Sequence, residues 1–310
     1  NYDFYLNDRQ LIQVDLTLAD EKAEVFAPEL RNEMNSWTFP LHFIDFETSM
    51  VALPFTKARK PYEQVAFQFS AHTLHKDGRM EHHEWIDTNT GVFPNYEFVR
   101  QLKAVLEKDD GTIFKYSAHE NTVLNQIKTQ MLDDDESKYG ELIEWIETIT
   151  SWNEGGVKGS GYRNMVDLLQ MVRKYYYHPD MGGSNSIKKV LPAVMTGDAV
   201  KKKYSKPLDF GTHLKGRVLW ELNPETGKPE NPYHLLPGQY GDLDLTEDEL
   251  ILEDANIQEG GAAMMAYAKM QFTDMADEER EALRNALLQY CELDTLAMVM
   301  IYEHWRESIL

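Results

Sequence analysis

A short apolar run, residues 40–48, restricts both the fold and the chemistry of this chain because it contains two acidic side chains. Its β-branched and aromatic residues, with Pro40 at the start, predict a β-strand. Side chains two residues apart share one face of a strand, so Asp45 and Glu47 point the same way. Burying two carboxylates among apolar neighbours is costly unless a cation lies between them, and a divalent metal is the simplest explanation. An isolated Asp-x-Glu more often marks the solvent face of a strand, so a partner elsewhere in the chain is needed to favour the metal.

That partner lies in the last predicted helix, which runs from about residue 277 to residue 308. Asp294 stands there among apolar residues that recur at three- and four-residue spacing and form one buried face, namely Leu287, Cys291, Met298, Ile301 and Trp305. Asp has a poor propensity for a helix interior and no capping role in mid-helix. Tyr290, one turn earlier, can reach the same pocket. We therefore expect Asp294 to bind a metal rather than to be a tolerated surface acid.

The segments between these two motifs predict an α/β fold with a mixed sheet. The expected elements are strands at 65–73, 79–86 and 112–116, with a hairpin turn at Asp77-Gly78 and a helix at 95–108. Glu120 then stands at the start of a helix, just beyond the carboxyl end of the last strand. Sites of α/β proteins form at such positions, although acidic residues in a first helical turn also commonly compensate the helix dipole.

Composition narrows the class of protein. The 310 residues are 42% hydrophobic and 11% aromatic, and no apolar stretch is long enough to span a membrane. The single cysteine, Cys291, allows no internal disulfide and reads as a small core residue, which predicts a reducing, cytoplasmic location. A formal net charge of −21 argues against the broad phosphate-binding surface of duplex-DNA-binding proteins. Local basic clusters remain, and each is either a binding groove or a solvated surface: residues 57–60, 188–189 and 201–206.

Three motifs resemble those of the DEDD 3′-to-5′ exonuclease superfamily, which has a ribonuclease-H-like fold. They are Asp45-x-Glu47, Glu120 behind Tyr116-Ser-Ala-His, and Tyr290-x-x-x-Asp294. Longer stretches are similar to a bacterial family known as a domain of unknown function: Phe43-Ile-Asp-Phe-Glu-Thr, Pro61-Tyr-x-Gln, Ser186-Ile-Lys-Lys-Val-Leu-Pro192 and Tyr290-Cys-x-x-Asp-Thr295. The resemblance covers about residues 40–305 and implies a ribonuclease-H-like mixed sheet flanked by helices.

In that family the domain often follows a restriction-endonuclease-like domain. We therefore expect residues 1–38 to be a lead-in that remains from a longer protein with an upstream nuclease-like domain. Residues 39–310 are expected to form the exonuclease-like domain.

The resemblance also implies a role for each motif residue. Asp45 would bridge two metal ions, Glu47 and Asp294 would ligate one of them, and Glu120 would hold the second through water. Tyr290 would orient the attacking water. An all-oxygen ligand set predicts two Mg²⁺ or Mn²⁺ ions, which suit the two-metal hydrolysis of a phosphodiester.

The segment between the second and third motifs yields weaker predictions. A helix is expected at 164–177, where Asp167 either approaches the site or compensates the helix dipole. The loop 182–188 opens into another helix, and its free N–H groups with Ser186 and Lys188 could bind a phosphate, although the spacing is not that of a P-loop.

Three further expectations carry no chemistry. Residues 204–256 read as an irregular insertion with short strands around 217–222, and residues 18–36 read as a helix. The histidines His72, His82 and His83 read as strand or surface residues, because no zinc-ligand spacing joins them.

These observations together predict a metal-dependent nuclease, most simply a 3′-to-5′ exonuclease acting on the ends of single-stranded DNA or RNA. Gln289 occupies the position of the histidine that marks the histidine subtype, so the chain resembles the tyrosine subtype. A ribonuclease-H-like endonuclease and an interaction module with weak metal affinity are the alternatives.

Overall fold

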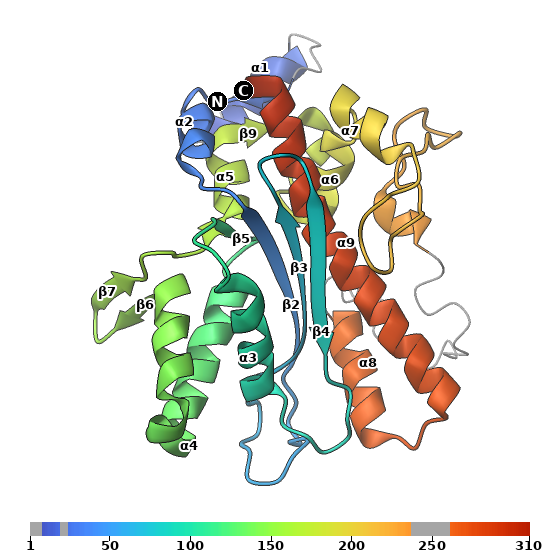
Figure 1. Cartoon of the computed structure of the whole chain (residues 1–310). Coiled ribbons are helices and arrows are strands. Elements are labelled where there is room, and N and C mark those ends of the chain that lie inside the picture. The colour runs from blue at the N-terminus through green and yellow to red at the C-terminus, as the bar shows by residue number, and fades with distance from the viewer. Residues whose placement is uncertain (1–7, 19–23, 237–260) are drawn as a thin grey trace, which may run out of the picture.

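The computed structural model describes residues 8–18, 24–236 and 261–310. A five-stranded sheet lies at its centre (Figure 1). Its strands in spatial order are β4 (Met80–Ile86), β3 (Val65–Leu74), β2 (Leu41–Ser49), β5 (Ile113–Lys115) and β8 (Val166–Asp167). The strand β3 pairs antiparallel with both neighbours, whereas β5 is parallel to β2 and to β8. The predicted mixed α/β sheet is confirmed, and this order of strands is compatible with a ribonuclease-H-like arrangement.

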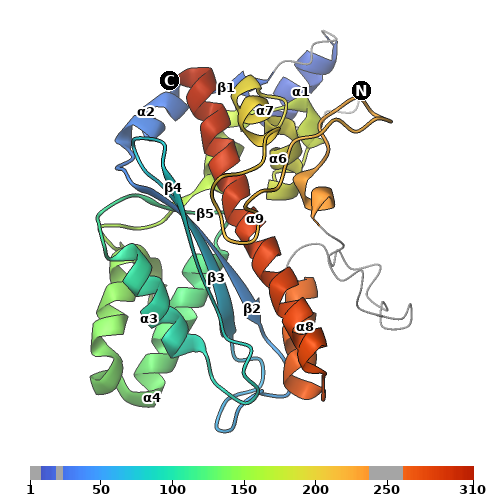
Figure 2. The ribbon, with the colours of Figure 1, turned by 45° about the vertical axis from the view of Figure 1, so that its right-hand side comes forward.

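Helices cover both faces of the sheet, as the two ribbon views show (Figures 1 and 2). One face carries α3 (Asn95–Leu106) and α4 (His119–Ile149), and α9 (Asp277–Ile309) crosses the other. Ile44 packs in the core on the α3 and α4 side, whereas Phe43 packs on the α9 side. Because side chains alternate along a strand, Asp45 and Glu47 share the α9 face with Phe43.

The remaining elements surround this sheet. They are α1 (Asp8–Leu18), β1 (Val25–Phe26), α2 (Glu29–Ser36), β6 (Ser151–Glu154), β7 (Val157–Ser160), α5 (Leu168–Tyr175), β9 (Tyr176–Tyr177), the 3₁₀ turns η1 (Pro179–Met181) and η2 (Pro232–Leu235), α6 (Ile187–Val194), α7 (Asp198–Tyr204) and α8 (Gly261–Phe272). Within the described segments, none of the helices combines the length and apolarity needed to cross a lipid bilayer.

Of the helix predicted at 18–36, Leu18 ends α1, residues 19–23 lie outside the described residues, and the remainder is helical only at its end. Residues 29–36 form α2, but Val25 and Phe26 pair with β9 in a short antiparallel ladder. Pro28 directly precedes α2, a position where its missing amide hydrogen is not needed by the helix. Leu30 of α2 is fully buried in the same core cluster as Phe43, so the segment before the sheet packs against it.

The helix predicted at 164–177 is shorter than expected because both of its ends join sheets. Val166 and Asp167 pair with β5 as the edge strand β8, and β9 follows α5. The Asp167 carboxylate accepts a hydrogen bond from the Gln170 backbone N–H and so caps α5. The edge strand was missed because two residues are too few to show an alternating pattern.

The segment 205–236 is irregular, as predicted for the insertion. The expected strands around 217–222 do not form, and only an isolated bridge joins Leu222 to Pro229. The rest of the predicted insertion, residues 237–256, lies outside the described residues.

Candidate metal centre

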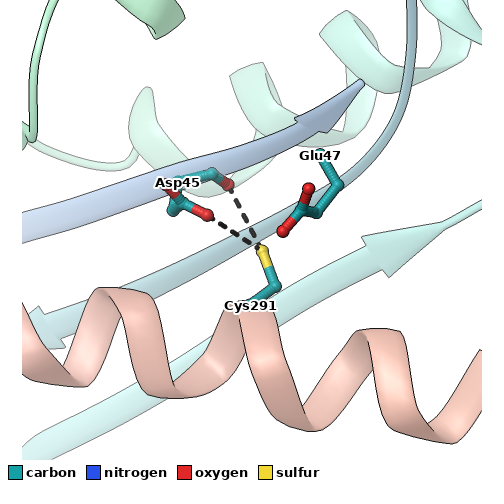
Figure 3. Close-up of side chains that lie close together, drawn as sticks. All are labelled: Asp45, Glu47 and Cys291. Atoms are coloured by element: carbon teal, nitrogen blue, oxygen red, sulfur yellow. Dashed lines mark hydrogen bonds between the residues drawn. The ribbon is translucent and has the colours of Figure 1, made fainter. Parts of the chain in front are cut away.

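The strand β2 presents Asp45 and Glu47 to the face that α9 crosses, where both side chains meet Cys291 (Figure 3). One ligand atom from each of these three residues lies within 4.8 Å of the others. The Cys291 thiol is 3.5 Å from Asp45 Oδ2 and 3.7 Å from the Asp45 carbonyl oxygen, and it donates to both. The predicted pairing of the two β2 carboxylates is therefore observed.

The helix α9 supplies the third carboxylate. Asp294 follows Cys291 by three residues and so lies on the same side of α9. The hydroxyl of Tyr233, from η2, donates a hydrogen bond to the Asp294 carboxylate. The rings of Tyr233 and Tyr290 are 5.6 Å apart, and the Lys188 ammonium lies 4.9 Å from the Tyr290 ring centroid.

The fourth carboxylate, Glu120, stands in the first turn of α4 and is only 1% exposed. It follows a turn in which Ser117 has a φ of 96°, a conformation that is unfavourable for a residue with a Cβ. Asp167 stabilises this turn by accepting from the Ser117 N–H at 3.2 Å and by pairing with Lys115 Nζ at 3.2 Å. Glu120 Oε2 is buried and lacks a hydrogen-bond partner within the described part of the chain.

Burial raises the pKa values of all four carboxyl groups. The pKa of Asp45 rises well above its usual range, first through burial and then through the neighbouring carboxylates. Burial raises the pKa of Glu47 to about 8, against the nearby Lys188 charge, and that of Glu120 to about 8. Burial raises the pKa of Asp294 to about 6, while the Tyr233 hydrogen bond opposes the rise. Such a site must take up protons or cations.

These residues line one cleft of about 800 Å³. Every residue expected to have a catalytic, metal or substrate role lines it: Asp45, Glu47, Glu120, Tyr290, Asp294, Ser186 and Lys188. Arg173 of α5 adds a second cationic side chain to the wall. The start of α6 at Ile187 also faces the cleft, as the predicted loop-to-helix opening requires.

Two side chains of the centre, Cys291 and Tyr233, are not predicted from the sequence. Cys291 is buried in the core, as expected, but its thiol also contacts Asp45. Its spacing from Asp294 along the helix is the sequence feature that indicates this contact. Tyr233 lies in the irregular segment, where no periodic pattern indicates which side chains turn inward. His72 and His82 lie on strands β3 and β4, as predicted. Both side chains are buried, and burial lowers the pKa of His82 to about 3.

Comparison with known families gives one match. Residues 42–186 match the family model described as Domain of unknown function (DUF2779). The DUF2779 match includes Asp45, Glu47 and Glu120 but ends before the helix that carries Asp294. Neither the curated proteins nor the solved structures contain a significant match to the chain.

Proposed function

We propose that this protein is a two-metal-ion nuclease, most simply a 3′-to-5′ exonuclease that hydrolyses the ends of single-stranded nucleic acids. The observation that carries the proposal is the convergence of four buried carboxylates from β2, α4 and α9 on one cleft: Asp45, Glu47, Glu120 and Asp294. The likeness of the sequence motifs to those of the DEDD superfamily supports the same reading.

The residues of the cleft fit a pair of hard divalent cations. Carboxylate oxygens are the ligands that Mg²⁺ and Mn²⁺ prefer. The buried Glu120 Oε2, which has no donor among the described residues, is an acceptor that a cation or its bound water would satisfy. Asp45 would bridge the two ions, Glu47 and Asp294 would ligate one, and Glu120 would hold the second through water. When bound, such ions acidify the attacking water and stabilise charge on the attacking and leaving oxygens.

Side chains around the carboxylates would orient the substrate. Tyr290 can hold the attacking water by a hydrogen bond, since a phenol with an ordinary pKa near 10 is a poor base at neutral pH. Lys188 and Arg173 lie in the cleft wall, where their charges can pair with phosphate oxygens. The start of α6, where Ser186 occupies the N-cap position, offers backbone N–H groups to the same phosphate. Tyr233 holds the Asp294 carboxylate in place.

The test is digestion of end-labelled single and double strands of DNA and RNA with Mg²⁺ or Mn²⁺. We expect a ladder that shortens one nucleotide at a time from the 3′ end of the single strand, and 5′-labelled and 3′-labelled substrates together report the polarity. Internal fragments at early times would indicate an endonuclease instead. No cleavage of any substrate with either metal would contradict the proposal and favour an interaction module.

A further inference from the structure

A second group of potential metal ligands lies outside the cleft. His82 and Glu84 stand two residues apart on β4 and so point to the same face, and Glu292 of α9 meets them there. One ligand atom from each lies within 4.8 Å of the others. The His82 side chain is 1% exposed, Glu292 is fully buried, and Glu84 is 21% exposed. None of the three lines the cleft around Asp45.

One arrangement of the hydrogen bonds around His82 places its proton on Nε2. With the Thr295 hydroxyl donating to the Glu292 carbonyl oxygen at 3.0 Å, it accepts from Ser70 Oγ, which lies 2.8 Å away. Ser70 has then used its only proton and must accept from His82 Nε2 at 2.9 Å. His82 Nδ1 is then the unprotonated nitrogen, and its lone pair accepts from Thr212 Oγ1 at 2.8 Å, so a cation that binds Nδ1 replaces this hydrogen bond.

That lone pair faces two carboxylate oxygens. His82 Nδ1 is 3.8 Å from Glu292 Oε1 and 4.0 Å from Glu84 Oε2. His82 Nδ1 accepts from the Thr212 hydroxyl and Glu292 Oε1 from the Thr212 N–H, but the two carboxylates still repel each other unless a cation or a proton lies near them. Glu84 Oε2 is also buried without a hydrogen-bond partner among the residues that the structure describes. A cation beside these three ligand atoms would relieve the repulsion.

Other contacts hold the two carboxylates in this orientation. His213 Nε2 lies 2.8 Å from the opposite oxygen of Glu84. Glu292 accepts hydrogen bonds from the backbone N–H groups of Thr212 at 2.9 Å and His213 at 2.7 Å. Metal ligands are commonly oriented by such outer hydrogen bonds, and His82 has one as well through Nε2 and Ser70.

We propose that His82, Glu84 and Glu292 bind one first-row transition-metal ion of the Zn²⁺ class. One imidazole nitrogen with two carboxylate oxygens suits such an ion better than Mg²⁺, which prefers oxygen ligands alone. Zn²⁺ bonds of about 2.0–2.2 Å require the ligand atoms to lie closer together than they do here. Binding therefore requires the Glu84 side chain, the most exposed of the three, to rotate inward and the Glu292 carboxylate to shift toward His82. The ion ties β4 to α9 and to the loop 210–214, so its role is structural.

The test compares two neighbouring histidines on β4. His83 is 32% exposed and points to the opposite face of the strand, so His83→Gln is a matched control for His82→Gln. The chain of residues 1–310, stripped of metal, is titrated with Zn²⁺ while its melting temperature is followed. Bound Co²⁺ is counted by metal analysis and visible absorption. We expect wild type and His83→Gln to bind one ion more than His82→Gln, and Zn²⁺ to raise the melting temperature only where that ion binds.

Two further variants separate this site from the cleft. Asp45→Asn removes a carboxylate of the cleft, and we expect it to retain the His82-dependent ion. If His82→Gln does not fold, Glu84→Gln at the partly exposed ligand replaces it in the comparison. The proposal would be overturned if wild type and the folded ligand variant bound equal amounts of Co²⁺, or if Asp45→Asn lost all Zn²⁺ binding. Both outcomes are independent of whether the cleft hydrolyses nucleic acid.

Discussion

The Tyr233 hydroxyl donates a hydrogen bond to the carboxylate of Asp294, which lies 61 residues further along the chain. Tyr233 is only 6% exposed, and burial together with the Asp294 charge raises its pKa well above the ordinary value, so the phenol stays protonated as a donor. The irregular segment before residue 237 thus supplies part of the centre. Through Tyr233, this segment holds in place Asp294, the carboxylate that α9 contributes to the cleft.

Replacing Tyr233 with phenylalanine tests this contact. The change removes the donor that favours the charged form of Asp294, so we expect Mn²⁺ to bind more weakly by roughly tenfold to a hundredfold, the usual effect of a hydrogen bond to a charged group. Isothermal titration of Mn²⁺ into the metal-free protein measures the change. Tyr290→Phe is the matched control, since that ring is adjacent and its loss of a hydroxyl is predicted to affect turnover rather than Mn²⁺ affinity. Unchanged affinity in Tyr233→Phe would show that the contact does not support metal binding.

Tyr290→Phe is predicted to slow hydrolysis while leaving Mn²⁺ affinity nearly unchanged. Loss of one water-orienting hydrogen bond costs roughly tenfold to a thousandfold in turnover. Because the ring already packs against Tyr233 at a centroid distance of 5.6 Å, phenylalanine keeps that packing. Single-turnover cleavage at saturating metal measures the effect. Full activity in the purified variant would leave Tyr290 with a packing role only.

Asp294→Asn is predicted to abolish hydrolysis without unfolding the protein, because the change removes a ligand charge but keeps the shape of the side chain. Asp45→Asn should behave in the same way. Asp110→Asn, at an exposed loop position outside the cleft lining, is the matched control and should keep full activity. Circular dichroism checks the fold of each variant. Near wild-type turnover in either cleft variant with Mn²⁺ present would rule out its carboxylate as an essential ligand.

The metal-free protein is predicted to lose stability as the pH rises. Glu47 and Glu120 have pKa values raised from 4.5 to about 8 in the fold, mainly by burial, so between these limits the folded state binds more protons than the unfolded state. The contribution of these two groups to the stability of the folded state is fully present below about pH 4.5 and is lost as the pH rises through 8. Lys188 and Lys115 oppose the shifts, whereas Asp294 and Asp167 add to them.

Melting temperatures measured from pH 5 to pH 9, with EDTA or with Mg²⁺, check this pH dependence. We expect the decline with pH in EDTA and a much flatter profile with Mg²⁺, because the ion replaces the protons. A profile in EDTA that is flat or rises over this range would contradict the assigned pKa shifts. No effect of Mg²⁺ at any pH would indicate that the cleft binds no such ion.

How much of this structure the sequence predicts depends on the length of each pattern. The run at 40–48 and the helix at 277–309 have enough periodic residues to specify their buried faces, so the placement of Asp45, Glu47 and Asp294 follows from local rules. Val25–Phe26 and Val166–Asp167 are strands of two residues each, which exist only because a partner strand lies beside them. Short strands of this kind leave no periodic signal.

Cys291 and Tyr233, the two side chains of the centre that the sequence does not predict, also differ in how much local pattern surrounds them. Cys291 lies on the helical face of Asp294, so its approach to Asp45 was accessible to spacing arguments, although the apolar stripe favoured a plain core position. Tyr233 reaches Asp294 from a segment with no regular structure except a short 3₁₀ turn. Its position depends on the tertiary packing of that segment, and no local rule predicts it.

The most direct test of the central claim is a Mn²⁺ titration of the metal-free chain, followed by electron paramagnetic resonance, in wild type and in Asp45→Asn. Free Mn²⁺ gives a sharp signal that weakens on binding, so the titration counts bound ions directly. Because Asp45 is the carboxylate expected to bridge two ions, we predict that the variant binds two fewer Mn²⁺ than wild type at the same concentration. Equal binding by the two proteins would contradict the assignment of this cleft as a metal centre.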